Sequence, residues 1–296
     1  MTVLLFDEDV GARLTPALAV EGARRALVGA HRGELHAPPR VQADLGGRAL
    51  VFTAGGLSDG AAGFRVYQTG AAVADQLVVV WGPDGGLAGC IVGQELGAAR
   101  TGALGAAAVD ALALPDAEVV GVVGSGRQAW TQLWALTAVR QVARVRVHSP
   151  TGAHREHFAE RARAELGLEA TAVPAAREAV EGAQIVVLAT RSETPVIEPE
   201  WVSPGAHVNT VGPKAAGACE TPPELAEAAA VVVSDSPVQA AAYGAPFFTS
   251  RELVHLGAVI ADEAPGRTSE SDVTLYASTG LAGSEVVIAR SLLETA

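Results

Sequence analysis

Residues Val119 to Ala129 contain the pattern with the clearest chemical meaning in the chain. A short apolar run ends in Gly124-x-Gly126-x-x-Ala129, and apolar residues at helical spacing follow it. A strand, a tight glycine turn and a helix in this order place a helix N-terminus beside a pyrophosphate. Gly124 permits the turn, Gly126 lets the backbone approach the phosphates, and Ala129 lets helix and strand pack closely. The segment predicts a dinucleotide site; a glycine-rich turn in an unrelated α/β domain is the alternative.

Three arginines in the N-terminal third have surroundings that suit a binding site for an anion. Arg40 follows two prolines, Arg65 lies in an apolar strand-like run, and Arg100 lies among small residues with helical character. A guanidinium group binds a carboxylate through two parallel hydrogen bonds. We expect the three side chains to share an anion pocket; a surface salt bridge is the alternative for each.

The chain has a single lysine, Lys214, and arginine supplies the rest of its 21 basic residues. Arginine stays protonated and cannot exchange a proton, whereas burial lowers the pKa of a lysine toward neutrality. Lys214 follows a predicted strand, so it is a candidate acid–base group. A lysine that points to solvent is an alternative of at least equal weight.

Further cofactor-binding candidates follow from the expected sheet, because ligands of open α/β sheets bind beyond the carboxyl ends of the strands. The residues at those ends are Ser125, Gly126, Arg127, Gln128, Ser149, Thr151, Thr190, Arg191, Ser192 and Gly212. No carboxylate stands at the end of the second strand, and Arg155 follows one helical turn later. Hydroxyl groups and an arginine suit a 2′-phosphate better than a bare ribose. We therefore expect NADP in preference to NAD; the alternative is that Arg155 faces solvent.

The apolar patterns predict an α/β fold with two units. The first, residues 1–114, has a helix over 15–33, a hairpin around Gly82-Pro83-Asp84-Gly85 and a helix over 97–114, which indicate an α+β unit with an antiparallel sheet. From residue 115 to 271 strands and helices alternate, which predicts a Rossmann-type parallel sheet with right-handed crossovers. Residues 272–296 end in a helical pattern that we expect to pack back onto the first unit.

Composition restricts the class of partner. The chain has 296 residues and a formal net charge of −12, which argues against nucleic acid and anionic membranes. We expect no membrane span and no secretory leader, and therefore a cytoplasmic protein. The two cysteines, Cys90 and Cys219, have no metal-ligand spacing, and the histidines form no zinc motif. No metal site is predicted.

These motifs in this order resemble the ornithine cyclodeaminase/mu-crystallin family over nearly the whole chain. The resemblance rests on Pro38-Pro39-Arg40, Gly63-Phe64-Arg65, Arg100-Thr101, and residues 121–129, 204–212 and 273–281. It implies a Rossmann domain joined to a substrate and dimerisation domain that both chain ends build, a homodimer, and a nicotinamide cofactor. It also implies a small ligand that bears a carboxylate next to a nitrogen.

The resemblance assigns residues as well. Arg40 and Arg100 would hold the carboxylate, and Ser278 and Gly280 would lie near the nicotinamide. Thr101 and the Val211–Gly212 turn join the expected cofactor contacts.

Two positions depart from the family pattern. Arg65 stands where the family commonly has a lysine that transfers protons, and Pro213 and Lys214 stand where cyclodeaminases and alanine dehydrogenases carry an aspartate. Ring-closing deamination needs several proton transfers by a group of tunable pKa, whereas reduction of a preformed imine needs little beyond a hydride and orientation. We expect an imine reductase or amino-acid dehydrogenase, with Arg40, Arg65 and Arg100 clamping the carboxylate and Arg65 and Lys214 as the catalytic candidates. The alternatives are an ornithine cyclodeaminase-type lyase with recycled NAD and a non-catalytic NADP-binding protein.

Overall fold

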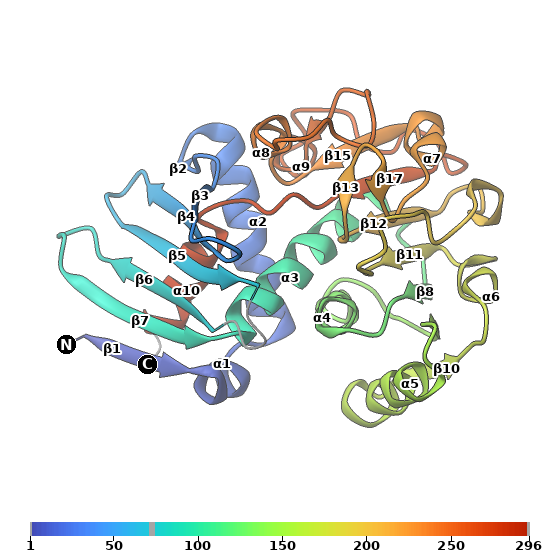
Figure 1. Cartoon of the computed structure of the whole chain (residues 1–296), viewed down its shortest axis with the longest axis horizontal. Helices are drawn as coiled ribbons and strands as arrows, with labels where there is room; N and C mark the ends of the chain where they lie inside the picture. The colour runs from blue at the N-terminus through green and yellow to red at the C-terminus, as the bar shows by residue number, and fades with distance from the viewer. Residues whose placement is uncertain (1, 71–74, 295–296) are drawn as a thin grey trace.

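The computed structural model describes residues 2–70 and 75–294, which form two sheets with helices between and around them (Figure 1). Residues 1, 71–74, 295 and 296 of the expected first unit lie outside the described residues. None of the described helices is long and apolar enough to span a bilayer.

The first sheet comes from the N-terminal third and has the order β1-β7-β6-β5-β4-β2, with β3 paired to β4. Its strands are β1 (Val3–Phe6), β2 (Leu35–His36), β3 (Val41–Asp44), β4 (Ala49–Leu57), β5 (Ala62–Thr69), β6 (Gln76–Trp81) and β7 (Leu87–Gly93). The predicted hairpin joins β6 to β7, and the N–H of Gly82 donates to the carbonyl of Gly86 at 2.9 Å. The pairing is antiparallel except at the edge, where β1 lies parallel to β7. The sheet is therefore antiparallel as predicted, apart from the parallel edge strand β1, which was not predicted.

The second sheet has eight parallel strands in the order β10-β9-β8-β11-β12-β17-β15-β16. They are β8 (Val119–Val123), β9 (Arg144–His148), β10 (Glu169–Ala172), β11 (Ile185–Leu188), β12 (His207–Thr210), β15 (Val231–Ser234), β16 (Val254–His255) and β17 (Thr274–Ala277). A separate two-stranded ribbon joins β13 (Lys214–Ala215) to β14 (Ala218–Cys219). The parallel, Rossmann-type sheet predicted from the alternation of strands and helices is confirmed.

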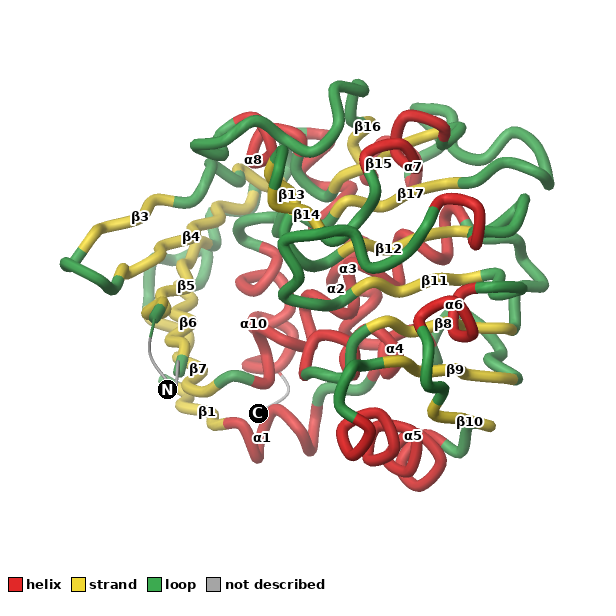
Figure 2. Tube along the Cα trace, turned by 45° about the vertical axis from the view of Figure 1, so that its right-hand side comes forward, coloured by secondary structure: helices red, strands yellow, loops and turns green. Residues whose placement is uncertain are grey.

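Helices fill the space between the two sheets and cover the outer side of the second (Figure 2). They are α1 (Asp7–Arg13), α2 (Pro16–Arg32), α3 (Glu95–Leu112), α4 (Arg127–Leu136), α5 (Gly152–Leu166), α6 (Ala176–Val180), α7 (Pro223–Ala228), α8 (Pro237–Ala241), α9 (Leu256–Ile260) and α10 (Ser284–Glu294). Local signals set the limits of α2. The Thr15 hydroxyl accepts from the N–H of Leu18, Pro16 opens the helix, and Gly33 ends it at φ 75°.

Helix α3 is buried along most of its length because it lies between the two sheets. Its glycines allow helix α4 to approach. A Cβ at Gly102 would lie 2.1 Å from the carbonyl oxygen of Thr131, and one at Gly105 would lie 2.0 Å from Oε1 of Gln132. The close packing holds α3 in a fixed position against the second sheet, and Arg100 and Thr101 with it.

The C-terminal segment serves both sheets. Strand β17 lies between β12 and β15 in the second sheet, and helix α10 packs on β5, β6 and α2. Of the span 272–296, the strand therefore belongs to the parallel sheet, and α10 is the element that returns to the first sheet. The chain between them, residues 278–283, crosses from one sheet to the other.

Candidate active site

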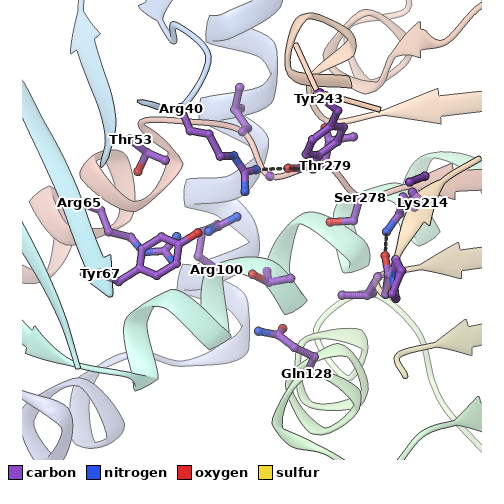
Figure 3. A pocket seen from close by; sticks show the side chains of 18 of the residues that line it. Arg40, Thr53, Arg65, Tyr67, Arg100, Gln128, Lys214, Tyr243, Ser278 and Thr279 are labelled. Atoms are coloured by element: carbon purple, nitrogen blue, oxygen red, sulfur yellow. Dashed lines mark hydrogen bonds between the residues drawn. The ribbon is translucent and has the colours of Figure 1, made fainter. Parts of the chain in front are cut away.

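A cavity of about 570 Å³ lies where the two sheets face each other across α3 (Figure 3). The first sheet contributes Thr53, Arg65 and Tyr67, the segment between β2 and β3 contributes Arg40, and α3 contributes Arg100 and Thr101. The second sheet and its loops contribute Gln128, residues 211–215, Ala218, residues 243–245 and residues 278–281; α10 contributes Glu285. Both sheets, α3 and α10 therefore contribute to the wall of the cavity, and its volume is typical of a small-molecule binding site.

Two of the predicted arginines meet a buried carboxylate. Arg65 Nη1 donates to Oε1 of Glu285, and Arg100 Nη2 donates to the same oxygen at 2.5 Å. Burial by itself would raise the pKa of Glu285, but the charges of Arg100 and Arg65 outweigh it and lower that pKa to about 2. Glu285 is therefore ionised at neutral pH and fixes both guanidinium groups at the base of the cavity.

Arg40 reaches the same place from the segment before β3. Its Nη2 donates to the carbonyl oxygen of Thr279, and its guanidinium lies 5.8 Å from the centroid of the Tyr243 ring. Gly280 separates it from Arg100, because a Cβ at Gly280 would lie 3.0 Å from Nη2 of Arg40 and 3.5 Å from Nη1 of Arg100. The fold thus brings Arg40, Arg65 and Arg100 into one cavity rather than onto separate surfaces.

Several polar atoms in the cavity wall are buried and have no hydrogen-bond partner among the described residues. They are Nε of Arg40, Arg65 and Arg100, Oγ1 of Thr53 and Oε1 of Gln128. Buried polar groups in proteins are nearly always satisfied. A cluster of exceptions around one cavity indicates a polar ligand.

Lys214 is the first residue of the short strand β13, which follows β12 and forms part of the cavity wall. Its ammonium donates to the carbonyl oxygen of Gly212 at 2.5 Å, and its exposed fraction is 8%. Burial lowers the pKa of Lys214 to about 8, although the negative charges of Glu220 and Asp235 act in the opposite direction. The alternative of a lysine pointing to solvent is wrong.

Two buried carboxylates hold the loops at the strand ends. Glu220 accepts from the N–H groups of Thr190, Val211 and Gly212 and from the hydroxyls of Thr190 and Thr210. It therefore joins the ends of β11 and β12.

Asp235 plays the same part at the end of β17. It accepts from the N–H groups of Thr279 and Gly280 and from the hydroxyls of Tyr276 and Thr279. Since the carbonyl of Thr279 accepts from Arg40, Asp235 also fixes the partner of that arginine.

The glycine turn after β8 has room for a dinucleotide. Gly124 has φ 118°, and a Cβ there would lie 2.3 Å from the carbonyl oxygen of Ala189. Gly126 precedes α4, and a Cβ built on it meets no atom within 4 Å. The turn therefore requires glycine at 124 for its own backbone, while the open space at 126 leaves the helix N-terminus accessible to a phosphate. These features fit a nicotinamide dinucleotide.

The other cofactor candidates have different surroundings. Ser125 is half-buried in the turn, and the exposed Arg127 donates to Oε1 of Gln94. Gln128, Thr101, Val211, Gly212, Ser278 and Gly280 line the cavity. The hydroxyl of Thr190 is committed to Glu220, that of Ser192 donates to Thr194 at 2.6 Å, and Arg191 is exposed.

The end of β9 carries the group expected to distinguish the two cofactors. Arg155 Nη1 donates to the carbonyl oxygens of Ser149 at 3.0 Å and Pro150 at 3.4 Å. Its side chain is half-buried, and the exposed Thr151 stands between it and the end of the strand. The guanidinium therefore lies at the strand end rather than free in solvent.

Sequence reasoning missed the carboxylates and the aromatic residues of the site. Glu285 stands in an apolar helical run. The one signal in the sequence was its position on the apolar face of that helix, where a charged residue needs a partner. Glu220 and Asp235 gave no comparable signal. Tyr67, whose ring lies 4.2 Å from the Arg65 guanidinium, and Tyr243 were not singled out either.

The chain is similar to known proteins over nearly its whole length. The model of the ornithine cyclodeaminase/mu-crystallin family matches residues 4–296. The Delta(1)-pyrroline-2-carboxylate reductase of Thermococcus litoralis, solved with NADH and L-proline, superposes with a TM-score of 0.87 at 25% identity, over 99% of this chain and 97% of that one.

Two other enzymes are similar in sequence and in structure. The iminosuccinate reductase of Paracoccus denitrificans is 31% identical over 74% of this chain and 70% of its own length, and its NAD⁺ complex superposes with a TM-score of 0.87 at 25% identity, over 99% of this chain and 95% of that one. An archaeal alanine dehydrogenase, solved as a dimer with bound NAD, gives a TM-score of 0.86 at 26% identity, over 99% of this chain and 95% of that one. In sequence, the alanine dehydrogenase of Archaeoglobus fulgidus is 32% identical over 67% of this chain, an alignment that spans only 62% of that relative.

Proposed function

The chain belongs to the ornithine cyclodeaminase/mu-crystallin family, and from that premise we propose that it is an NAD(P)-dependent oxidoreductase acting on the C–N bond of a small imino or amino acid. The observation that carries the proposal is a cavity in which three guanidinium groups face the strand ends of a dinucleotide-binding sheet. Such a cavity would bind a carboxylate ligand beside the reactive end of a nicotinamide cofactor.

The arginines orient the substrate. Arg40 and Arg100 flank Gly280, and each retains N–H groups beyond those it donates to Thr279 and Glu285. A carboxylate bound to these groups would leave the neighbouring C=N carbon near Ser278. Because Glu285 already fixes Arg65 and Arg100, little side-chain freedom is lost when the substrate binds.

The cofactor supplies the redox chemistry. When bound, the reduced nicotinamide would supply a hydride for the iminium carbon, and the C=N electron pair would become the lone pair of the amine nitrogen. Gly124 to Gln128, with the Val211–Gly212 turn, Ser278 and Gly280, would hold the cofactor. Arg65 has no proton to exchange at neutral pH, so we assign it to carboxylate binding and alignment rather than proton transfer.

The charge of the cavity disfavours the cyclodeaminase alternative. Among its described lining residues, four side chains are cationic and one, Glu285, is anionic, which leaves a formal charge of +3. A diamino acid would bring a second ammonium group into this field, and the carboxylate that could receive it is already shared by two arginines. Repulsion between like charges makes that substrate unfavourable.

A homodimer fits the free face of the first sheet. The helices α2, α3 and α10 cover one face of that sheet (Figure 2), whereas the opposite face presents an apolar row. The row runs across five strands through Phe52, Val66, Leu77, Val92 and Phe6. Phe6 is 51% exposed and Phe52 39%, so a second copy of this chain is the partner we propose for this face. We propose the cytoplasm as its compartment, where the free thiols Cys90 and Cys219 would stay reduced.

One set of assays tests the function. The protein is incubated with NADPH or NADH and either Delta(1)-pyrroline-2-carboxylate or a 2-oxo acid with ammonia, and loss of the reduced cofactor is followed. In parallel, ornithine is supplied with NAD⁺ and free ammonia is measured. Oxidation of the cofactor with formation of the amino acid supports the proposal. Ammonia release without net change in cofactor, or cofactor binding with no reaction in either assay, contradicts it.

A further inference from the structure

The positive charge of the cavity exceeds what one substrate carboxylate neutralises. Four cationic side chains face it, and among the described lining residues only Glu285 opposes them. An imino acid with one carboxylate and a protonated nitrogen has no net charge, so it leaves the formal charge of +3 unchanged. Placing an iminium ion in such a field is costly at low dielectric unless another anion accompanies it.

The cations occupy two separate parts of the wall. Arg40, Arg65 and Arg100 cluster around Gly280 and Glu285. Lys214 lies on the other side of the cavity, in β13, with Ser278 between the two groups (Figure 3). The arginine cluster suffices for the carboxylate beside the nitrogen. Lys214 is then a second cationic position facing a different part of the ligand.

The ammonium group of Lys214 has N–H donors that make no hydrogen bond among the described residues. Its ammonium has three N–H bonds, and its one hydrogen bond among the described residues goes to the carbonyl of Gly212. The nearby carboxylates Glu220 and Asp235 are each occupied by four or more N–H and hydroxyl donors and lie outside the cavity lining. Their charges act on Lys214 and raise its pKa, but among the described residues neither carboxylate forms a salt bridge with it, so its remaining N–H donors are available to an anionic ligand.

We propose, on the basis of the reductase activity argued above, that the substrate is an imino acid with two carboxylates, the second of which pairs with Lys214. Two carboxylates and one iminium give the ligand a net charge of −1, which offsets part of the excess positive charge. The small side chains of Ala215 and Ala218 leave room for the distal carboxylate at this wall. The redox step is that of the proposed function: the hydride adds to the iminium carbon, the C=N electron pair becomes the lone pair of the amine nitrogen, and the distal carboxylate is unchanged.

A matched pair of substrates tests the proposal. Oxaloacetate and 2-oxobutyrate, each with ammonia, form imines that differ by a carboxylate in place of a methyl group. We expect kcat/KM with the dicarboxylate to be about 10- to 100-fold higher, the range of one charge-assisted hydrogen bond. In Lys214→Met the ratio should fall to about one through a rise in the KM of the dicarboxylate, and Lys214→Arg should retain it.

The control variant removes a positive charge outside the cavity. Arg144 lies at the exposed start of β9, so Arg144→Met should keep the wild-type ratio. A measurement that needs no turnover accompanies the kinetics: calorimetric titration of succinate and of butyrate into the protein with NAD⁺. Succinate should bind at least tenfold more tightly to the wild type, and the two should bind alike to Lys214→Met.

The outcomes separate this inference from the proposed function. Equal or better turnover of 2-oxobutyrate overturns the inference and leaves the reductase standing. An equal fall in kcat for both substrates in Lys214→Met also overturns it, because Lys214 then acts as an acid rather than as an anion partner. If no substrate is reduced, the reductase fails, and the calorimetric comparison still decides whether the cavity prefers a dicarboxylate.

Discussion

Arg100 of α3 and Glu285 of α10 are joined by a hydrogen bond of 2.5 Å although 185 residues separate them in the sequence. Both side chains are buried, and Arg65 donates to the same carboxylate oxygen from β5. The contact ties the helix between the two sheets to the C-terminal helix. It also sets the positions of two of the three guanidinium groups in the cavity.

Replacing Glu285 tests this contact. Glu285→Gln should lower the free energy of unfolding by about 3 kcal/mol at neutral pH, because it leaves two buried arginines without their anion. Chemical denaturation measures the change. The exposed Glu294, paired with Arg290 on the same helix, provides the control, and Glu294→Gln should change stability by less than about 0.5 kcal/mol.

The acid dependence of stability gives the same contact a second test. The pKa of Glu285 is about 2 in the folded protein against an ordinary value of 4.5. A lowered pKa stabilises the fold above the unfolded value, and that contribution disappears as the pH falls from about 4.5 toward 2. The stability difference between wild type and Glu285→Gln should shrink over this interval; a difference independent of pH would contradict the assignment.

Arg40 should matter for substrate and not for folding. Arg40→Met removes a guanidinium that faces the cavity, and we expect kcat/KM to fall about 10- to 100-fold. Arg13, exposed in α1, is the matched control for the loss of one positive charge. Similar activities of the two variants would show that Arg40 does not contact the substrate.

Substitutions at the two glycines of the turn after β8 should have different effects, one on stability and the other on cofactor binding. Gly126→Val places a side chain in open space, so the unfolding free energy should change little while NADH binding weakens at least tenfold. Gly124→Ala meets the Ala189 carbonyl at 2.3 Å in a left-handed backbone conformation, so it should destabilise the fold. Denaturation and NADH fluorescence titration distinguish the effects, and unaltered NADH binding in Gly126→Val would contradict the placement of the cofactor.

Arg155 should decide between the two cofactors. Its guanidinium lies at the end of β9, where a 2′-phosphate would bind, and we expect the wild type to bind NADPH more tightly than NADH. In Arg155→Met the affinity for NADPH should fall about tenfold while that for NADH stays the same. A wild type that binds both equally, or an equal loss for both in the variant, would refute the preference.

The preference for dicarboxylates should depend on pH. Lys214 has a pKa of about 8, set by burial and opposed by Glu220 and Asp235, so its ammonium loses its charge as the pH rises through that value. The kcat/KM ratio of dicarboxylate to monocarboxylate should be constant below the transition and fall above it. In Lys214→Arg the ratio should stay constant up to higher pH, because arginine remains charged.

The sequence predicted the elements whose limits depend on residues close to one another in the chain. The Gly124–Ala129 turn, the limits of α2 and the β6–β7 hairpin follow from neighbouring residues, and each lies where expected. Strand β1 was missed because its partner β7 is more than 80 residues away.

The site divides in the same way. Arg40, Arg65 and Arg100 could be singled out by type and by apolar surroundings, but Glu285 could not be linked to them, since their meeting depends on how α10 returns to the first sheet. Lys214 was recognised by its rarity, whereas its burial depends on the β13–β14 ribbon and the loops around it. Sequence therefore identified candidates, and tertiary packing determined their partners and charges.

Transfer of label from the cofactor tests the reductase most directly. The protein is supplied with NADPH or NADH carrying deuterium at the transferable position of the nicotinamide, together with the imine formed from oxaloacetate and ammonia or with Delta(1)-pyrroline-2-carboxylate. Mass spectrometry of the amino acid should find deuterium on the α-carbon, in an amount equal to the cofactor oxidised. Product without deuterium, or bound cofactor that is never oxidised by any of these imines, would contradict the account.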